Sequence, residues 1–92
     1  MGTLDFGDER DRQYLRSIRR RLLRRGLKPV LDEEWEVHGP HPGMPYMVFI
    51  GYAEDKKGYW HCVAIYPRAV YEIDDPKDWW KVEAEDRIPC WW

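Results

Sequence analysis

Amide side chains are almost absent from this sequence, which contains no asparagine and a single glutamine, Gln13. Serine and threonine are equally scarce, with one of each, Ser17 and Thr3. Charged residues, by contrast, make up 35% of the 92 residues. A shortage of thermolabile amides together with many charges is typical of thermophile proteins. We therefore expect a thermophilic source, either a cell or a virus.

Long apolar runs are also lacking. No stretch approaches the roughly 20 apolar residues that span a bilayer, and the N-terminus does not show the basic-then-apolar order of a secretory signal. We therefore expect a cytoplasmic protein without a membrane partner. Only two cysteines are present, Cys62 and Cys90, and in such a protein we expect them to be reduced thiols rather than a disulfide.

Patterns that carry catalysis are scarce as well. The sequence has no glycine-rich phosphate loop, and residues 46–53 and 59–66 contain neither an acid nor a lysine. A metal-dependent nuclease built on a helix and a β-meander needs such groups on its strands to hold a metal and activate water. We therefore expect no enzyme, and a nuclease-like enzyme is the alternative that fits the sequence least.

The sequence signal for a metal site is equally weak. No Cys-x-x-Cys pair occurs, and the adjacent His61 and Cys62 should point to opposite faces of a strand. They can form neither a catalytic dyad nor two ligands of one site. We expect no metal and no cofactor.

What the chain does contain is apolar and aromatic material for one core. Hydrophobic residues make up 43% of the sequence, and 14 aromatic residues include six tryptophans. That content is too high for a disordered chain. Residues 1–92 are therefore expected to form a single domain.

The basic charge is concentrated in residues 10–28. Eight arginines and one lysine stand there against one acid, Asp11, so this segment carries a formal charge of +8. Residues 1–9 carry −3 and residues 29–92 carry −7, which gives the net charge of −2. The molecule is therefore a basic segment attached to an acidic body.

This basic segment is expected to be a helix over residues 9–25. Asp8 suits the N-cap, acids follow in the first turn, and Gly26 suits the C-terminal cap. An apolar stripe at helical spacing gives the helix one buried face, formed by Tyr14, Leu15, Ile18 and Leu22. The opposite face carries the candidate contacts for a partner or for phosphate groups: Arg12, Arg16, Arg19, Arg20 and Arg24.

Like charges four residues apart repel each other, by roughly 0.2–0.5 kcal/mol per pair on a helix. A counter-charge is therefore expected near the arginines, and two sources remain open. One is the chain's own acids, namely Asp32, Glu33, Glu34, Glu36, Asp74, Asp75, Asp78, Glu83, Glu85 and Asp86. The other is an anionic partner.

The remaining chain predicts strands. Residues 34–38 alternate, residues 46–53 and 59–66 form a hairpin with Gly58 in its turn, and residues 70–73 suit a further strand. Asp75 followed by Pro76 starts a short helical turn. The expected class is α+β, with the arginine-rich amphipathic helix packed on a three- or four-stranded antiparallel sheet, followed by a short C-terminal helical turn or edge strand.

With Asp55 opposite Tyr59, the hairpin has two apolar faces. The face with Phe49, Val63 and Ala53 should receive the helix, and the face that is richer in aromatic residues needs a cover from the C-terminal part of the chain. Aromatic residues that stay exposed would form a second candidate surface for bases or for a protein. Its candidates are Tyr52, Trp60, Tyr66, Trp91 and Trp92.

These observations predict a small non-enzymatic interaction protein. The first hypothesis is a module that binds a protein partner or a second copy of itself, such as an inhibitor or accessory factor of viral or phage type. The alternative is a protein that binds DNA or RNA, with the arginines of the helix on phosphates. A pI near 5.9 favours the first, because dedicated nucleic-acid binders are usually basic overall.

Overall fold

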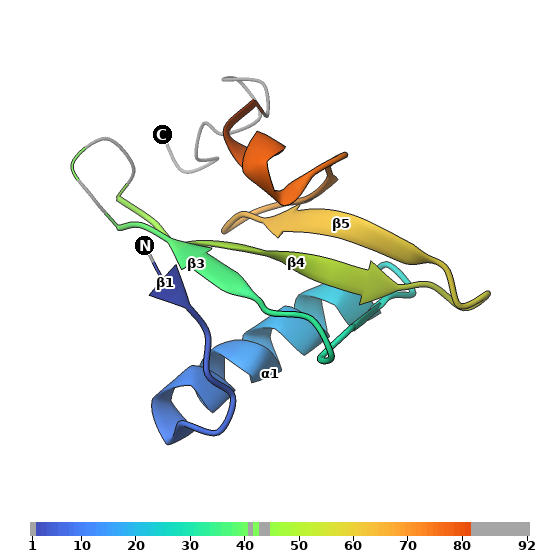
Figure 1. The fold of residues 1–92 in the computed structure, drawn as a ribbon, viewed down its shortest axis with the longest axis horizontal. Coiled ribbons are helices and arrows are strands. Elements are labelled where there is room, and N and C mark those ends of the chain that lie inside the picture. The colour runs from blue at the N-terminus through green and yellow to red at the C-terminus, as the bar shows by residue number, and fades with distance from the viewer. Residues whose placement is uncertain (1, 41, 43–44, 82–92) are drawn as a thin grey trace.

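A helix lies across one face of a twisted antiparallel sheet, and a short helical turn lies on the other (Figure 1). The computed structural model describes residues 2–40, 42 and 45–81. The elements in chain order are β1 (Gly2–Thr3), α1 (Glu9–Leu23), β2 (Lys28–Pro29), β3 (Glu36–His38), β4 (Val48–Glu54), β5 (Trp60–Ile65), β6 (Val70–Glu72) and the 3-10 helix η1 (Pro76–Lys81). The predicted α+β class is confirmed.

Helix α1 begins at the predicted residue, and both predicted capping residues, Asp8 and Gly26, act as caps. Asp8 has extended backbone angles, and its carboxylate accepts a hydrogen bond from the Arg10 amide at 2.8 Å. At the other end Gly26 has a φ of 73°, and the Leu27 amide donates to the Leu22 carbonyl at 3.0 Å. This Schellman geometry satisfies carbonyls of the last turn. The regular helix stops at Leu23, two residues before the expected end.

The hairpin of β4 and β5 has the predicted register. Tyr52 pairs with Cys62, and the Asp55 amide donates to the Tyr59 carbonyl at 2.9 Å. Gly58 takes the left-handed position in the turn, with a φ of 89°. The strand pairs of the described residues are all antiparallel. The strand order is β1-β3-β4-β5-β6, with β2 also paired to β4.

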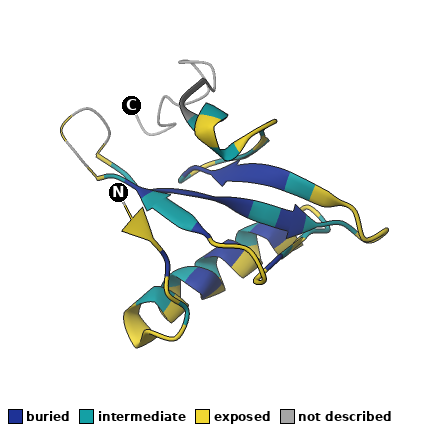
Figure 2. Ribbon diagram, viewed as in Figure 1, coloured by how far each residue is buried: buried dark blue, intermediate teal, exposed yellow. Residues whose placement is uncertain are grey.

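Both faces of the hairpin are buried (Figure 2). The expected face receives the helix, and the cluster on this side contains Leu4, Ile18, Leu22, Trp35, Phe49, Ala53, Val63 and Ile65. The opposite face is built from Val48, Ile50, Ala64 and Tyr66, with Tyr46, Tyr71, Ile73 and Trp79 packed against them. The aromatic face is therefore covered in part by η1, as predicted.

Trp35 is the centre of the helix-side cluster. Its side chain is fully buried, and its indole N–H donates to the Val30 carbonyl at 2.9 Å. The ring lies directly over Gly51 of β4, where an added methyl group would overlap it. The glycine inside this strand therefore makes room for the tryptophan.

Two short strands widen the sheet beyond the three or four strands expected. Within the described residues the sheet has six strands, because β1 pairs with β3 and β2 pairs with β4. Each is two residues long, too short to produce an alternating pattern. The N-terminal arm is thus held by pairing and by buried Leu4, whose amide donates to the Trp35 carbonyl at 2.8 Å. The expectation of a further strand or helix after residue 81, and those for Cys90, Trp91 and Trp92, lie outside the described residues.

Candidate functional site

All five predicted arginines on α1 are exposed: Arg12, Arg16, Arg19, Arg20 and Arg24. Within the part of the chain that the structure describes, none of these five arginines forms an ion pair with a carboxylate. Neutralisation by Asp32, Glu33 or the acids near η1 is therefore not observed. The candidate counter-charges Glu83, Glu85 and Asp86 lie outside the described residues.

Helical spacing divides the basic residues between two surfaces. Residues 12, 16, 19 and 23 follow one another at steps of four, three and four, so they share one side of the helix. We call this surface, formed by Arg12, Arg16, Arg19 and Leu23, the outer arginine face. Leu23 was not among the predicted site residues, although its side chain is 74% exposed. A leucine outside the buried stripe was the signal that could have revealed it.

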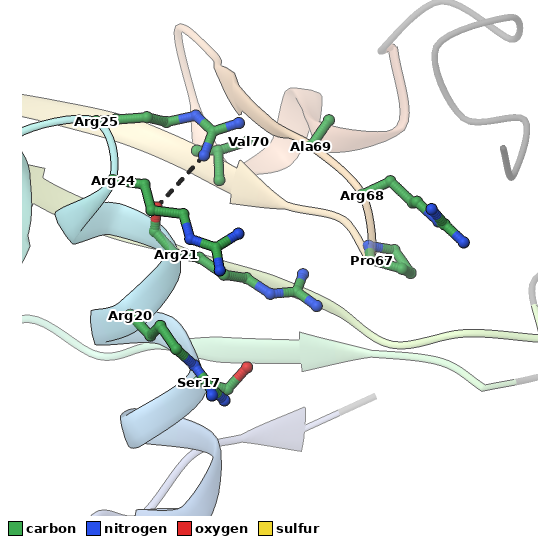
Figure 3. Close-up of a pocket in the computed structure, with 9 residues that line it drawn as sticks. All are labelled: Ser17, Arg20, Arg21, Arg24, Arg25, Pro67, Arg68, Ala69 and Val70. Atoms are coloured by element: carbon green, nitrogen blue, oxygen red, sulfur yellow. Dashed lines mark hydrogen bonds between the residues drawn. The ribbon is translucent and has the colours of Figure 1, made fainter.

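The second surface is a pocket between the C-terminal half of α1 and the turn that joins β5 to β6 (Figure 3). Its volume is about 290 Å³. We call it the arginine pocket, and its described lining is Ser17, Arg20, Arg21, Arg24, Arg25, Pro67, Arg68, Ala69 and Val70. The structure thus separates Arg20 and Arg24 from the other predicted arginines and joins them to residues far away in the sequence.

Arg21 connects the two walls of the pocket. Its side chain extends from α1 toward the turn (Figure 3). The guanidinium donates a hydrogen bond to the Tyr66 carbonyl. Partial burial lowers the pKa of Arg21, and the neighbouring charges of Arg20, Arg24 and Arg25 lower it further. Arg25 in turn donates to the Arg21 carbonyl at 3.3 Å. Both residues follow Ile18 at helical spacing, which places them at the margin of the buried stripe.

The predicted aromatic surface is smaller than expected. Trp60 is 50% exposed and its ring lies 6.1 Å from that of Tyr52, so these two residues remain accessible together with Tyr59. Tyr66 is only 2% exposed, and its hydroxyl donates to the Trp79 carbonyl at 2.9 Å. Its assignment to an exposed surface was wrong, because Tyr66 points to the face that η1 covers. Trp91 and Trp92 lie outside the described residues.

A histidine near the hairpin turn is held between two carboxylates. His61 Nε2 lies 2.8 Å from Asp55 Oδ2, and Nδ1 contacts Glu72 Oε1. Hydrogen bonding to Asp55, and then to Glu72, raises the pKa of His61, whereas the bond to His61 lowers the pKa of Asp55. Both ring nitrogens are engaged, so the arrangement stabilises an imidazolium that donates in two directions.

The neighbouring Cys62 is a free thiol. Its side chain is buried, on the opposite face of β5 from His61, as strand alternation predicts. Burial raises the pKa of Cys62 to about 11, which keeps the thiol protonated at neutral pH.

Compared with protein-family models, with curated proteins and with solved structures, this chain gives no match. Among the described residues, no helix is both long enough and apolar enough to cross a bilayer.

Proposed function

We propose that this protein is a small non-enzymatic interaction protein that binds an acidic surface of a protein partner through the outer arginine face. The supporting observation is that Arg12, Arg16 and Arg19 are exposed and, in the described residues, without an acidic partner. Neighbouring arginines repel each other at this spacing. An acidic partner would relieve that repulsion and gain charge-assisted hydrogen bonds.

Leu23 favours a protein over a nucleic acid as this partner. Among the residues whose burial the structure describes, it is the most exposed of the large apolar side chains. It lies one helical turn after Arg19 and Arg20. A leucine surrounded by arginines matches the composition of protein interfaces, in which an apolar anchor is desolvated and arginines are enriched. A phosphate backbone offers no apolar pocket for such a side chain.

Nucleic acid is the second candidate, and the straight line of arginines favours it. From Arg12 to Arg19 the helix rises about 10 Å. Guanidinium groups pair with phosphate oxygens in a bidentate manner, so this line can follow a nucleic-acid backbone. In that case Leu23 would contribute nothing to the affinity.

Fluorescence anisotropy with defined probes tests the two candidates. The protein is titrated into a labelled helical peptide with leucines flanked by glutamates, a labelled DNA duplex and a labelled single strand, at about 50 and about 200 mM salt. The protein-partner proposal expects the peptide to bind, with losses of affinity in both Leu23→Gln and the double variant R16E/R19E. The matched control K56E/K57E makes the same charge change in the hairpin turn and should retain binding.

The outcomes separate the candidates. Duplex or single-strand binding that R16E/R19E abolishes and Leu23→Gln leaves intact would replace the protein partner by nucleic acid. Failure of every probe to bind at the lower salt concentration would contradict both candidates, because electrostatic association is strongest there.

A further inference from the structure

The arginine pocket is a second charged site, separate from the outer arginine face. Arg20 and Arg21 come from the last turn of α1, and Arg24 and Arg25 follow directly after the helix. The opposite wall is formed by Pro67 and Ala69 of the turn and by Val70 at the start of β6 (Figure 3). We propose that this pocket binds a phosphate monoester, the group carried by a phosphorylated side chain or a sugar phosphate. The inference goes beyond the proposed function, because the two surfaces lie on different sides of α1.

The positive charges around the pocket favour an anionic ligand. In the described residues, the lining contains Arg20, Arg21, Arg24 and Arg25 but no carboxylate. Burial and the adjacent arginines lower the pKa of Arg21, which shows that its positive charge is held at a cost. A bound anion would offset this repulsion in a partly desolvated place, where the attraction is stronger than in open water.

The donors fit a tetrahedral oxyanion. Guanidinium groups offer planar pairs of N–H donors that match phosphate oxygens, and Ser17, also in the lining, offers a hydroxyl. Arg21 is already oriented by its hydrogen bond to the Tyr66 carbonyl, so less side-chain freedom is lost when the anion binds. A phosphate monoester carries about −1.5 to −2 charges at pH 7, more than a phosphodiester, and has three strong acceptor oxygens.

The size and lining of the pocket restrict what carries the phosphate. A volume of about 290 Å³ is roughly ten times the share of one water molecule in the liquid, which leaves room for a phosphoryl group and the first atoms attached to it. Among the described lining residues there is no aromatic ring on which a base could stack. A phosphorylated side chain or sugar phosphate therefore fits better than a nucleotide.

Amide NMR titrations of the full 92-residue chain test this proposal. The added compounds are O-phosphoserine with blocked termini, the matching unphosphorylated serine compound and inorganic phosphate, all at constant ionic strength. We expect saturable shifts within residues 17–25 and 67–70 with phosphoserine and no shifts with serine. Saturation by inorganic phosphate at equal affinity would identify the free ion as the ligand, and weaker binding would identify a phosphorylated group.

Two exposed arginines of the same helix provide the matched variants. Arg24→Gln in the pocket should weaken phosphoserine binding about tenfold, the order expected for one charge-assisted contact. Arg16→Gln on the outer arginine face should change the affinity less than about twofold. Equal losses in both variants, or no saturation by about 10 mM ligand, would overturn the proposal. Neither result depends on Leu23 or on the peptide probe. The failure of this proposal would therefore leave the proposed function untouched, and the reverse is also true.

Discussion

At the scale of single residues, the helix-side core depends on one close approach. The indole of Trp35 occupies the space above Gly51, and its N–H is satisfied by the Val30 carbonyl. Close-packed interiors tolerate additional atoms poorly, since neighbouring side chains must leave their preferred rotamers. Gly51 is therefore expected to tolerate no side chain.

Gly51→Ala should lower the free energy of unfolding by at least about 2 kcal/mol, because the new methyl group overlaps the Trp35 ring. Urea denaturation followed by tryptophan fluorescence measures this loss. The control is Gly2→Ala, where an added methyl group meets nothing within 4 Å and the change should stay within about 0.5 kcal/mol. Equal stabilities of the two variants would show that the ring is free to move away.

His61 predicts a pH dependence of stability. Its pKa is raised above the ordinary value of 6.5, so the stability from its contacts is fully present below pH 6.5 and is lost as the pH rises through the raised pKa of the folded state. The pKa of Asp55 is lowered from the ordinary value of 3.8, so the stability from its ionised carboxylate is present above pH 3.8. This stability is lost as the pH falls through the lowered pKa of the folded state. The contribution is therefore largest between these limits.

The variant His61→Gln keeps a hydrogen-bonding side chain but cannot carry the charge. We expect wild type to melt above this variant at pH 5.5, and the difference to shrink by pH 9. Thermal denaturation at several pH values measures it, and taking the difference cancels titrations that both proteins share. A difference that is constant over this range would mean that the charge of His61 plays no part.

At the scale of elements, α1 combines favourable caps with an unfavourable charge pattern. The N-cap at Asp8 and the cap at Gly26 stabilise its ends, and the stripe of Leu15, Ile18 and Leu22 attaches it to the sheet. The arginines at steps of four residues oppose this by about 1 kcal/mol in total. Features that reduce stability are commonly retained for function.

Arg16→Glu should raise the free energy of unfolding by about 1 kcal/mol at low salt, because two repulsions with Arg12 and Arg20 become attractions. Arg16→Gln removes the repulsions without adding attractions, so it should give about half of the gain. Urea denaturation at low and high salt measures both, and the gains should fade with screening. A loss of stability in Arg16→Glu would reveal a carboxylate that pairs with Arg16.

At the scale of the whole molecule, charge is segregated. Residues 10–28 carry +8 and the remainder carries −10, although the net charge is only −2. Fields above such a surface depend on the local arrangement rather than on the net value. The protein should therefore behave as a cation toward a surface that meets α1.

At pH 7 and low salt we expect retention on a sulfonate cation exchanger, despite the net negative charge. The double variant R16Q/R19Q should elute at lower salt than K56Q/K57Q, which has the same net charge but loses its lysines from the hairpin turn. Identical elution of the two variants would mean that net charge, and not the outer arginine face, governs the interaction.

Much of the architecture was predictable because it depends on local sequence patterns. The caps at Asp8 and Gly26, the turn at Gly58 and the pairing of Asp55 with Tyr59 all depend on residues a few positions apart. Strands β1 and β2 were not predicted, since two residues cannot show a period. The candidate site was predicted in part: Arg20 and Arg24 were chosen, but the pocket that they share with residues 67–70 was not.

Periodicity, caps and turn residues act over short distances, so the sequence was enough to predict the arginine helix, its buried stripe, the hairpin register and the division of charge. Only packing places Tyr66 in the interior, Trp35 over Gly51, and Arg20 and Arg24 in one pocket with residues 67–70. These outcomes depend on which segments meet when the helix packs on the sheet. Arg21 and the Tyr66 carbonyl are 45 residues apart in the chain, and only packing brings them together.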